Sequence, residues 1–496
     1  MIRSCFHKFA EKIEYPRTPP FDPPEIFPEF SKNSGGETNI DRTNKVFPAV
    51  RQLLFQLDLD AANFGTNRWN PFKEFVTAGK NVLLKPNLVT HKHRKGPEAL
   101  FWTISHPAII RALFDYAYLA VGSSGKIVIG DTPIENCDFD ILCDATGLKE
   151  MVEILRGRGY RNLELLDFRT YQTIQYPDSS VAKINLPGDP WGYTDIDLGK
   201  ASLLQELEDA HGPQNYYTLG DHSVDHINPH ERAPGLPNRF HSNGKHIYRI
   251  PNSVLNSDFV VSIAKMKTHR FSGVTLCLKN AVGICQGKEY MPHRRPGTPQ
   301  EGGDSFPSYP SAKYVGWLKL KRAAYSAIGN RNVQRLMPYI RRVYPERLPH
   351  EINSEPLYGD WHGNDTVWRM TLDLNLILFH ADSQGFDLTS TKRTYLGVID
   401  GIIGMDHEAP MEGLPVKSNV LVIGRDPVST DTLGTFLMGF DPVKIKTINN
   451  ANTVQCKCLG KVNMGINFMK GNMEIEVSKS LFVPTKGWEY ILNNNV

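Results

Sequence analysis

Short apolar runs that end in polar residues, each followed by a helical pattern, recur along this chain and constrain its fold most strongly. The runs are 81–84, 126–130, 259–264, 396–399 and 419–424. Strands that alternate with helices in this way are typical of a mainly parallel sheet, because each crossover helix returns the chain to the edge where the next strand begins. We therefore predict an α/β fold with a mainly parallel sheet, helices on both faces and long inserted loops.

The third of these runs continues into a cationic segment. Side chains alternate across a strand, so Lys265, Lys267 and His269 lie on the face of Val261 and Ile263. Two ammonium groups beside an imidazole repel one another unless something anionic lies opposite. A lysine whose pKa is lowered by neighbouring cations can act as a base or a nucleophile. Lys265, Lys267 and His269 are therefore our candidate catalytic residues, with a solvated edge strand as the alternative.

Other polar residues are expected at the same edge of the sheet. Ligands of open α/β sheets bind outside the carboxyl ends of the strands, where loops and helix N-termini converge. Lysines and helix N-termini suit phosphate or carboxylate groups. We expect a helix over 275–281 whose first amides add to this site. The candidate substrate-binding residues are Lys85, Asn87, Thr275, Lys279, Asn280 and His293.

Three aspartates follow predicted strands and are candidate metal ligands. They are Asp131, Asp400 and Asp426. Several carboxylates together suit a hard divalent cation, so Mg²⁺ is the favoured cofactor and iron the second choice. Each aspartate also has a structural alternative, since Asp426 before Pro427 fits a helix N-cap and the other two fit turns. With the lysines, these aspartates predict an anionic small-molecule substrate bridged by a divalent metal.

Composition excludes several classes of partner. The net charge is only +3, which gives no basic field for nucleic acid. No apolar stretch is long enough to span a bilayer, and the charged N-terminus leaves no room for the apolar region of a signal peptide. The seven cysteines form no CxxC pair, so we expect a reducing cytoplasm. We predict no nucleic-acid or membrane partner and leave the oligomeric state open.

Shifts in composition divide the chain into six segments. They are a flexible N-terminal arm (1–45), a first α/β part (46–184), a His-rich insertion (185–250), a Lys-His strand with its helix and loop (251–312), a basic helical segment (313–360) and a C-terminal α/β part (361–496). In the insertion His222, His226 and His230 stand at four-residue steps. They would align on a helix and bind zinc or iron, although a polar loop is the simpler interpretation.

Several motifs together resemble the bacterial family catalogued as domain of unknown function 362. They are Lys85-Pro86-Asn87-Leu88-Val89, His106-Pro107, Ile129-Gly130-Asp131, Lys265-Met266-Lys267-Thr268-His269, Val274-Thr275, Leu278-Lys279-Asn280, Pro292-His293, Gly302-Gly303-Asp304, Asp400-Gly401-Ile402 and Asp426-Pro427. The resemblance covers about residues 80–445 and implies no general activity. Some relatives are joined to ferredoxin-like modules and described as iron-sulfur proteins, but this chain lacks those cysteines.

The chain departs from the family at 403–410, where relatives have a glycine-rich loop ending in Gly-Pro. The resemblance therefore implies no phosphate cradle at this loop, and Asp406, His407 and Glu408 are candidates for binding metal there instead.

The leading hypothesis is a cytoplasmic enzyme that transfers, eliminates or isomerises a group next to a phosphate or carboxylate. One alternative is an iron or iron-sulfur redox protein that uses Cys277, Cys285, Cys456, Cys458 and loop histidines. The other is a non-catalytic protein that binds an anionic metabolite.

Overall fold

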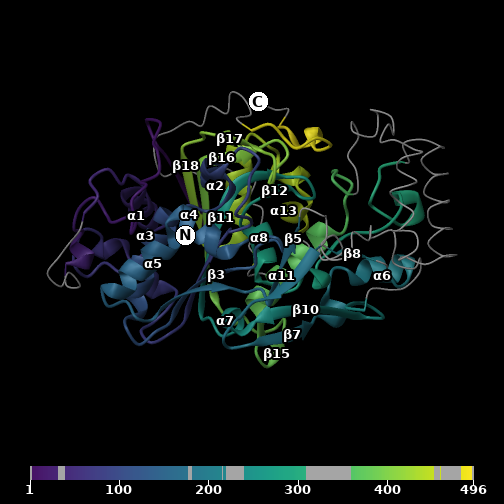
Figure 1. Ribbon diagram of the computed structural model, residues 1–496, viewed down its shortest axis with the longest axis horizontal. Coiled ribbons are helices and arrows are strands. Elements are labelled where there is room, and N and C mark those ends of the chain that lie inside the picture. Colours follow the sequence, from purple (N-terminus) through teal and green to yellow (C-terminus); the bar gives the residue numbers. More distant parts are fainter. Residues whose placement is uncertain are drawn as a thin grey trace.

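The computed structural model describes residues 3–31, 40–176, 181–214, 216–218, 239–308, 359–451, 459 and 482–493. Among these residues the largest sheet has nine strands, in the order β1-β18-β16-β11-β2-β3-β4, with β12 paired to β11 and β17 to β16. Figure 1 shows this sheet, with β3, β11, β12, β16, β17 and β18 labelled. The strands are β1 (Ser4–Lys8), β2 (Val82–Pro86), β3 (Ile127–Asp131), β4 (Leu163–Asp167), β11 (Phe259–His269), β12 (Gly273–Thr275), β16 (Thr394–Asp406), β17 (Leu414–Val416) and β18 (Val420–Gly424).

The centre of this sheet is parallel. β16, β11, β2, β3 and β4 run in one direction, whereas β18 is antiparallel to β16 and β1 is antiparallel to β18. The predicted mainly parallel α/β fold is confirmed. Because of these directions, the carboxyl ends of β2, β3 and β11 meet at one edge, while β18 ends at the opposite edge.

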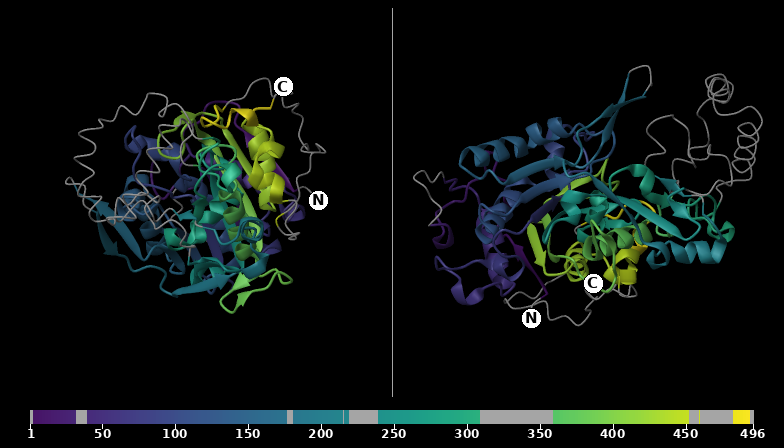
Figure 2. Two further views of the ribbon diagram at one scale, coloured as in Figure 1. Left: turned by 90° about the vertical axis from the view of Figure 1, so that its right-hand side faces the viewer. Right: turned by 90° about the horizontal axis from the view of Figure 1, so that it is seen from below.

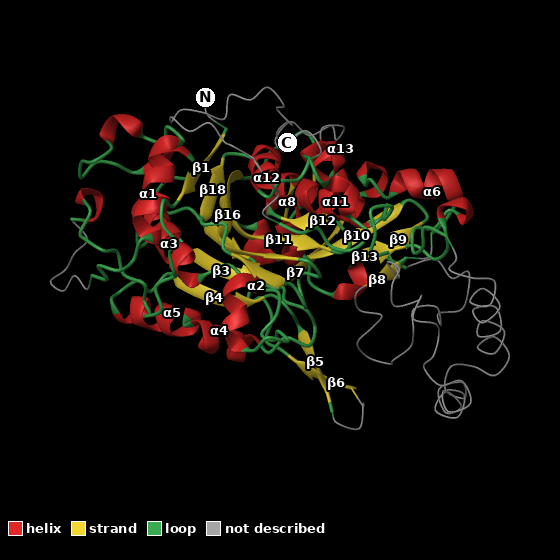
Figure 3. Ribbon diagram, turned by 90° about the horizontal axis from the view of Figure 1, so that it is seen from above, coloured by secondary structure: helices red, strands yellow, loops and turns green. Residues whose placement is uncertain are grey.

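Helices cover both faces of the sheet (Figure 3). The first face carries α1 (Val46–Gln56), α3 (Pro107–Val121), α4 (Phe139–Thr146) and α5 (Leu148–Gly157), and the second carries α8 (Cys277–Asn280), α11 (Val367–His380), α12 (Pro427–Leu437) and α13 (Lys446–Ala451). Val261 and Ile263 pack in the first core, whereas Val260 and Ala264 pack in the second. Burial on both faces explains why the parallel strands are continuously apolar.

Smaller elements surround this body. A three-stranded sheet of β7 (Tyr193–Asp197), β10 (Lys245–Pro251) and β9 (His241–Ser242) lies in the predicted insertion. The hairpin of β5 (Tyr171–Gln175) and β6 (Val181–Asn185) projects from the body (Figure 2). The remaining short elements are α2 (Leu100–Thr103), α6 (Gln205–His211), β8 (Tyr217–Thr218), α7 (Asn252–Leu255), β13 (Pro292–Arg294), β14 (Ala381–Asp382) and β15 (Gly385–Phe386). His222, His226, His230 and residues 313–358 lie outside the described residues.

None of the helices in the described part of the chain combines the length and apolar character needed to cross a bilayer.

The N-terminal segment differs from the predicted flexible arm. Ser4 to Lys8 pair with Gly424 to Val420 as the edge strand β1, and Ile13, Tyr15 and Phe21 are buried. The prolines that argue against a helix here fix an extended path, and the apolar side chains between them pack on the body. Most of the arm is therefore part of the fold. Residues 32–39 lie outside the described residues.

A buried ion pair fastens this arm to the centre of the sheet. Lys265 on β11 lies opposite Asp400 on β16, and its Nζ is 2.9 Å from Asp400 Oδ2. The same ammonium is 3.0 Å from the Tyr15 hydroxyl and 2.8 Å from the Phe101 carbonyl. Asp400 also accepts hydrogen bonds from Tyr15 and from the His106 amide. The carboxylate therefore joins the arm, both strands and the start of α3.

We predict that Asp400→Leu lowers the free energy of unfolding by about 3–5 kcal/mol, because it leaves the Lys265 charge buried without a partner. Lys265→Met combined with Asp400→Leu should cost much less, since no charge then stays uncompensated. Chemical denaturation measures both. A double variant at least as unstable as Asp400→Leu alone would contradict this account.

Candidate functional site

A cavity of about 240 Å³ lies at the carboxyl edge of the sheet, between the strand ends, β12, α8 and the chain that follows α8. We call it the lysine cavity. Its polar lining consists of Asn87, Asp131, Thr132, Lys267, His269, Arg270, Thr275, Lys279, Asn280, Lys288 and His293. Eight of the twelve predicted site residues are in this lining. The other four, Lys85, Lys265, Asp400 and Asp426, do not line the cavity.

Lys267 is held by neutral acceptors. Its Nζ is 2.8 Å from Asn87 Oδ1 and 2.8 Å from the Thr103 carbonyl. Lys265 bonds to the neighbouring Phe101 carbonyl, so both lysines reach α2 from one face of β11, as the alternation predicts. Burial and the charge of Lys265 lower the pKa of Lys267 to about 7. This ammonium is therefore a cation without a carboxylate of its own.

Lys279 has no hydrogen bond or ion pair with any residue that the structure describes. Burial and the charge of Lys288 lower its pKa to about 7. Lys288 is itself buried, and its Nζ is 3.5 Å from the Thr132 carbonyl, at the limit of a hydrogen bond. Burial also lowers the pKa of Lys288, while Glu135 and Asp131 oppose that change.

The two histidines of the cavity present different nitrogens. His269 Nδ1 accepts a hydrogen bond from the Phe271 amide at 3.1 Å, which places the proton of the neutral ring on Nε2. His293 Nδ1 is 2.9 Å from the Met291 carbonyl and must donate to it, which leaves a lone pair on Nε2. Burial, and next the charge of Lys279, holds the pKa of both imidazoles well below the usual value. At neutral pH the cavity thus has one imidazole donor and one imidazole acceptor.

Two buried hydroxyls in the cavity wall lack partners. Thr132 Oγ1 and Thr275 Oγ1 make no hydrogen bond within the described structure. Buried polar atoms are normally satisfied, so unpaired hydroxyls that line a cavity indicate contacts to be made with a ligand. Asn280, in contrast, donates to the Lys85 carbonyl at 3.0 Å and to Ser262 Oγ at 3.0 Å, which ties α8 to β2 and β11.

Asp131 is the carboxylate of this lining, and its oxygens are already occupied. Oδ1 is 2.6 Å from Lys85 Nζ and 2.8 Å from the Thr132 amide, and Oδ2 accepts from the Leu88 amide at 2.6 Å. A Cβ at Gly283 would lie 2.0 Å from Oδ1 and 2.6 Å from Lys85 Nζ, so only glycine allows the chain to cover this pair. Lys85 therefore balances Asp131, and the other cations of the cavity are left uncompensated.

Asp426 does not share this edge, so that part of the prediction is wrong. It caps α12, accepting from the Ser429 amide at 2.7 Å, and lies 3.5 Å from Arg3. Asp400 pairs with Leu421, and Asp426 follows Leu421 by five residues, which corresponds to roughly 17 Å along an extended strand. The strand-end rule failed here because β18 runs antiparallel to its neighbour.

The predicted helix over 275–281 is also corrected. Thr275 belongs to β12 and pairs with Lys267, and α8 begins only at Cys277. The amides of Cys277 and Leu278 donate to the carboxylate of Asp431 at 2.7 and 2.8 Å. An internal carboxylate therefore takes the helix N-terminus that we expected to bind the ligand.

The metal predictions find little support in the donor geometry. Within the residues that the structure describes, no three His, Cys, Asp or Glu side chains are grouped as a metal site requires. His407 Nδ1 lies 2.6 Å from Asp406, and Glu408 accepts from the Lys486 amide at 3.0 Å. Both oxygens of Asp131 and of Asp400 accept hydrogen bonds from protein groups. A divalent metal at this edge stays a prediction.

The cysteines proposed for iron are split between the described and undescribed parts of the chain. Cys277 and Cys285 are buried free thiols, and burial raises the pKa of both above the usual value, which disfavours the thiolate that binds iron. Cys456 and Cys458 lie outside the described residues.

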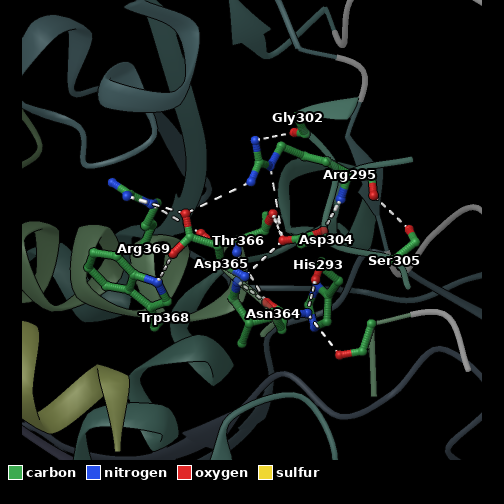
Figure 4. A network of polar contacts seen from close by, with 12 residues as sticks. His293, Arg295, Gly302, Asp304, Ser305, Asn364, Asp365, Thr366, Trp368 and Arg369 are labelled. Atoms are coloured by element: carbon green, nitrogen blue, oxygen red, sulfur yellow. Dashed lines mark hydrogen bonds and ion pairs between the residues drawn. The ribbon is translucent and has the colours of Figure 1, made fainter. Parts of the chain in front are cut away.

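A polar network fixes the loop that carries His293 (Figure 4). Asp304 accepts from the Arg295 amide at 2.6 Å, the Asp365 amide at 2.9 Å and the Thr366 hydroxyl at 2.6 Å. Beside it, Asn364 Nδ2 donates to the His293 carbonyl at 2.9 Å. The loop over 292–306 is therefore fastened to the start of α11, and Asp304 points to that helix rather than to the cavity.

Sequence reasoning missed Lys288 and Thr132 as residues of the cavity. Lys288 lies in a stretch that reads as a loop, where no periodicity indicates which side chains point inward. Thr132 directly follows Asp131, and the prediction selected the aspartate and not the threonine after it. A weak signal for Lys288 existed in the glycine before it, which favours a tight turn, and in the structure Gly287 has a φ of 88°.

Three comparisons with known proteins show what this chain is similar to. A search of curated proteins found no match. A crystal structure of a protein from Thermotoga maritima, a structural genomics target, aligns with a TM-score of 0.28 and 9% identity over 74% of this chain. The alignment spans 53% of that protein, about half of its length. The family model described as domain of unknown function 362 matches residues 219–436. This match covers a little under half of the chain and is to the same family that the sequence motifs resemble.

Proposed function

We propose that the lysine cavity binds the phosphate or carboxylate group of a small molecule, and that the protein is an enzyme acting next to that group. The observation that carries the proposal is the charge of the cavity. Lys267, Lys279 and Lys288 line it, and none of them forms an ion pair with a described residue. Buried like charges raise the free energy of a fold unless a counter-charge joins them. An anionic ligand supplies that counter-charge.

The nearby carboxylates of Asp131, Asp400 and Asp360 do not supply this counter-charge. Asp131 is paired with Lys85 at 2.6 Å, and Asp400 is paired with Lys265 at 2.9 Å. Arg270, a further cation of the lining, has its own partner in Asp360 at 3.6 Å. These three carboxylates thus each have a cation of their own. Glu135 acts on Lys288 without forming an ion pair with it, so the uncompensated charge of the cavity lies chiefly on Lys267 and Lys279.

The histidines support a catalytic role beyond binding. A neutral imidazole that offers a proton and another that accepts one are the groups needed for general acid and base catalysis. Their tautomers are set by the backbone of Phe271 and Met291, so the ligand does not have to organise them. Such a pair beside an anion suits elimination or isomerisation, and transfer equally where the leaving group needs a proton.

We also propose a divalent metal as cofactor and the cytoplasm as the location of the protein. Because the oxygens of Asp131 and Asp400 are occupied, we propose that Mg²⁺ enters as a companion of the anion rather than on a preformed carboxylate cage. The described cysteines, which are Cys5, Cys137, Cys143, Cys277 and Cys285, are all free, and free thiols fit a reducing compartment.

We expect the affinity for sulfate to fall as the pH rises through about 7. Lys267 and Lys279, whose pKa is about 7, lose their protons over this range, whereas sulfate stays fully ionised. Near and above that pH, binding should take up protons, because the bound anion raises the pKa of both amines. Calorimetric titration in two buffers of different ionisation enthalpy measures the uptake. Binding without proton uptake would contradict the role of these lysines.

Lys279→Gln should weaken sulfate binding about tenfold to a hundredfold at about pH 6, since a hydrogen bond to a charged group contributes about 1.5–3 kcal/mol. The matched control is Lys149→Gln, which removes a surface lysine paired with Asp140 on the outer face of the fold. The control should bind sulfate as the unmodified protein does. Equal binding by Lys279→Gln would refute the proposal.

The same substitution should stabilise the protein when no anion is present. Lys279 has a pKa of about 7 in the folded state, whereas a lysine of the unfolded chain keeps its ordinary pKa of about 10.5, so the unfolded chain binds more protons between these values. The stability of the unmodified protein should therefore rise from about pH 7 to about pH 10, and that of Lys279→Gln should rise less. Thermal unfolding across this pH range tests it, and identical slopes would count against an unpaired Lys279.

A further inference from the structure

We propose that Lys279 is a nucleophile that forms an imine with the carbonyl group of the substrate. The substrate class is then a small carbonyl compound that also carries a carboxylate or phosphate. This inference rests on the proposed anion binding in the lysine cavity, and it adds the reacting group that the proposed function leaves open.

The hydrogen bonds distinguish Lys279 from the other lysines of this edge. Lys85 and Lys265 are tied to carboxylates, and Lys267 is fully buried between two acceptors at 2.8 Å. Each of these amines would lose strong interactions on losing its proton. Lys279 is half-buried, lines the cavity and has no such partner among the described residues. Lys279 is therefore the lysine of this edge that loses no hydrogen bond or ion pair when its amine becomes neutral.

The charges around Lys279 favour its neutral form. Burial and the nearby ammonium of Lys288 keep its pKa near 7, so a large fraction of the amine is unprotonated at neutral pH. A desolvated lysine beside a second cation is a recognised way of preparing an amine for imine formation. Lys288 is held in place by burial and by the Thr132 carbonyl, which keeps that second cation in the cavity wall.

Some of the remaining groups of the cavity bind the anionic group of the substrate, and others take part in the reaction. Lys267 and Thr275 are paired across β11 and β12, so an ammonium and an unpartnered hydroxyl stand side by side to bind the anionic group. Lys279 lines the same cavity from α8. His269 and His293 line this cavity too, and burial together with the charge of Lys279 lowers the pKa of both rings.

The step balances with the groups present. Lys279 Nζ attacks the carbonyl carbon, a C–N bond forms, and the π electrons of the carbonyl move to its oxygen. His269 Nε2–H donates a hydrogen bond to that oxygen, and His293 Nε2 takes one proton from the cationic nitrogen and returns it to the oxygen, which gives a carbinolamine. As the C–O bond breaks, the nitrogen lone pair forms the C=N bond, the remaining N–H proton passes through His293 to the departing oxygen, and water leaves. No oxidant or reductant is needed.

Reductive trapping tests the proposal. The full-length protein is incubated with pyruvate, or separately with dihydroxyacetone phosphate, in the presence of cyanoborohydride, which reduces imines to stable secondary amines. We expect an adduct of the probe mass less one oxygen on the peptide that contains Lys279. The pyruvate arm reports a carboxylate-bearing substrate, and the other arm a phosphate-bearing one. Sulfate should slow the labelling, because it occupies the neighbouring anion position.

Two variants separate this proposal from anion binding. Lys279→Arg keeps the cation and should still bind sulfate, but it should lose the adduct, because a guanidinium does not form an imine. Lys149→Arg should label at Lys279 as the unmodified protein does.

If the protein binds sulfate but neither probe forms an adduct on Lys279, the imine proposal is wrong and anion binding stands. Equal labelling of surface lysines would likewise overturn the imine proposal alone. Absence of sulfate binding would overturn both proposals. The site mapping and the sulfate competition use the unmodified protein, so they decide the question even if a variant does not fold.

Discussion

Two buried ion pairs at the carboxyl edge of the sheet hold the structure together and determine where its charge is left over. Lys85–Asp131 joins β2 to β3, and Lys265–Asp400 joins β11 to β16. Each pair also accepts or donates hydrogen bonds with the surrounding backbone, so the cost of burying the charges is offset locally. Asp131 and Asp400 therefore each have a lysine partner already. The positive charge that remains belongs to Lys267, Lys279 and Lys288, which line one cavity.

The same excess of lysines over carboxylates affects both the stability of the protein and its proposed function. A protein selected only for stability would give each buried ammonium a carboxylate or replace it by an apolar side chain. Instead, Lys267 is held by an amide and a carbonyl oxygen, and Lys279 has no partner among the described residues. Strain of this kind is typical of sites where a ligand completes the structure. The neutral histidines at the same cavity add groups that move protons rather than hold charge.

The sequence predicted the features that depend on local pattern and missed those that depend on distant partners. Alternation along β11 placed Lys265 and Lys267 on the face of Val261 and Ile263, and the strand-end rule gathered Asn87, Asp131 and His269 at one cavity. The rule failed for Asp426 because the direction of β18 is set by its pairing with β16, far away in the sequence. The register that puts Lys265 opposite Asp400 is equally non-local. It turns the first candidate catalytic lysine into half of a buried ion pair.

The central claim is that the lysine cavity is completed by an anion, and crystals of the protein grown with sulfate test it most directly. The account predicts sulfate density within hydrogen-bonding distance of Lys267 or Lys279, with Thr275 Oγ1 as a further donor. It also predicts that the Lys85–Asp131 pair stays intact beside it. An ordered cavity at saturating sulfate that contains only water, or that is filled by a carboxylate of the protein itself, would contradict the account.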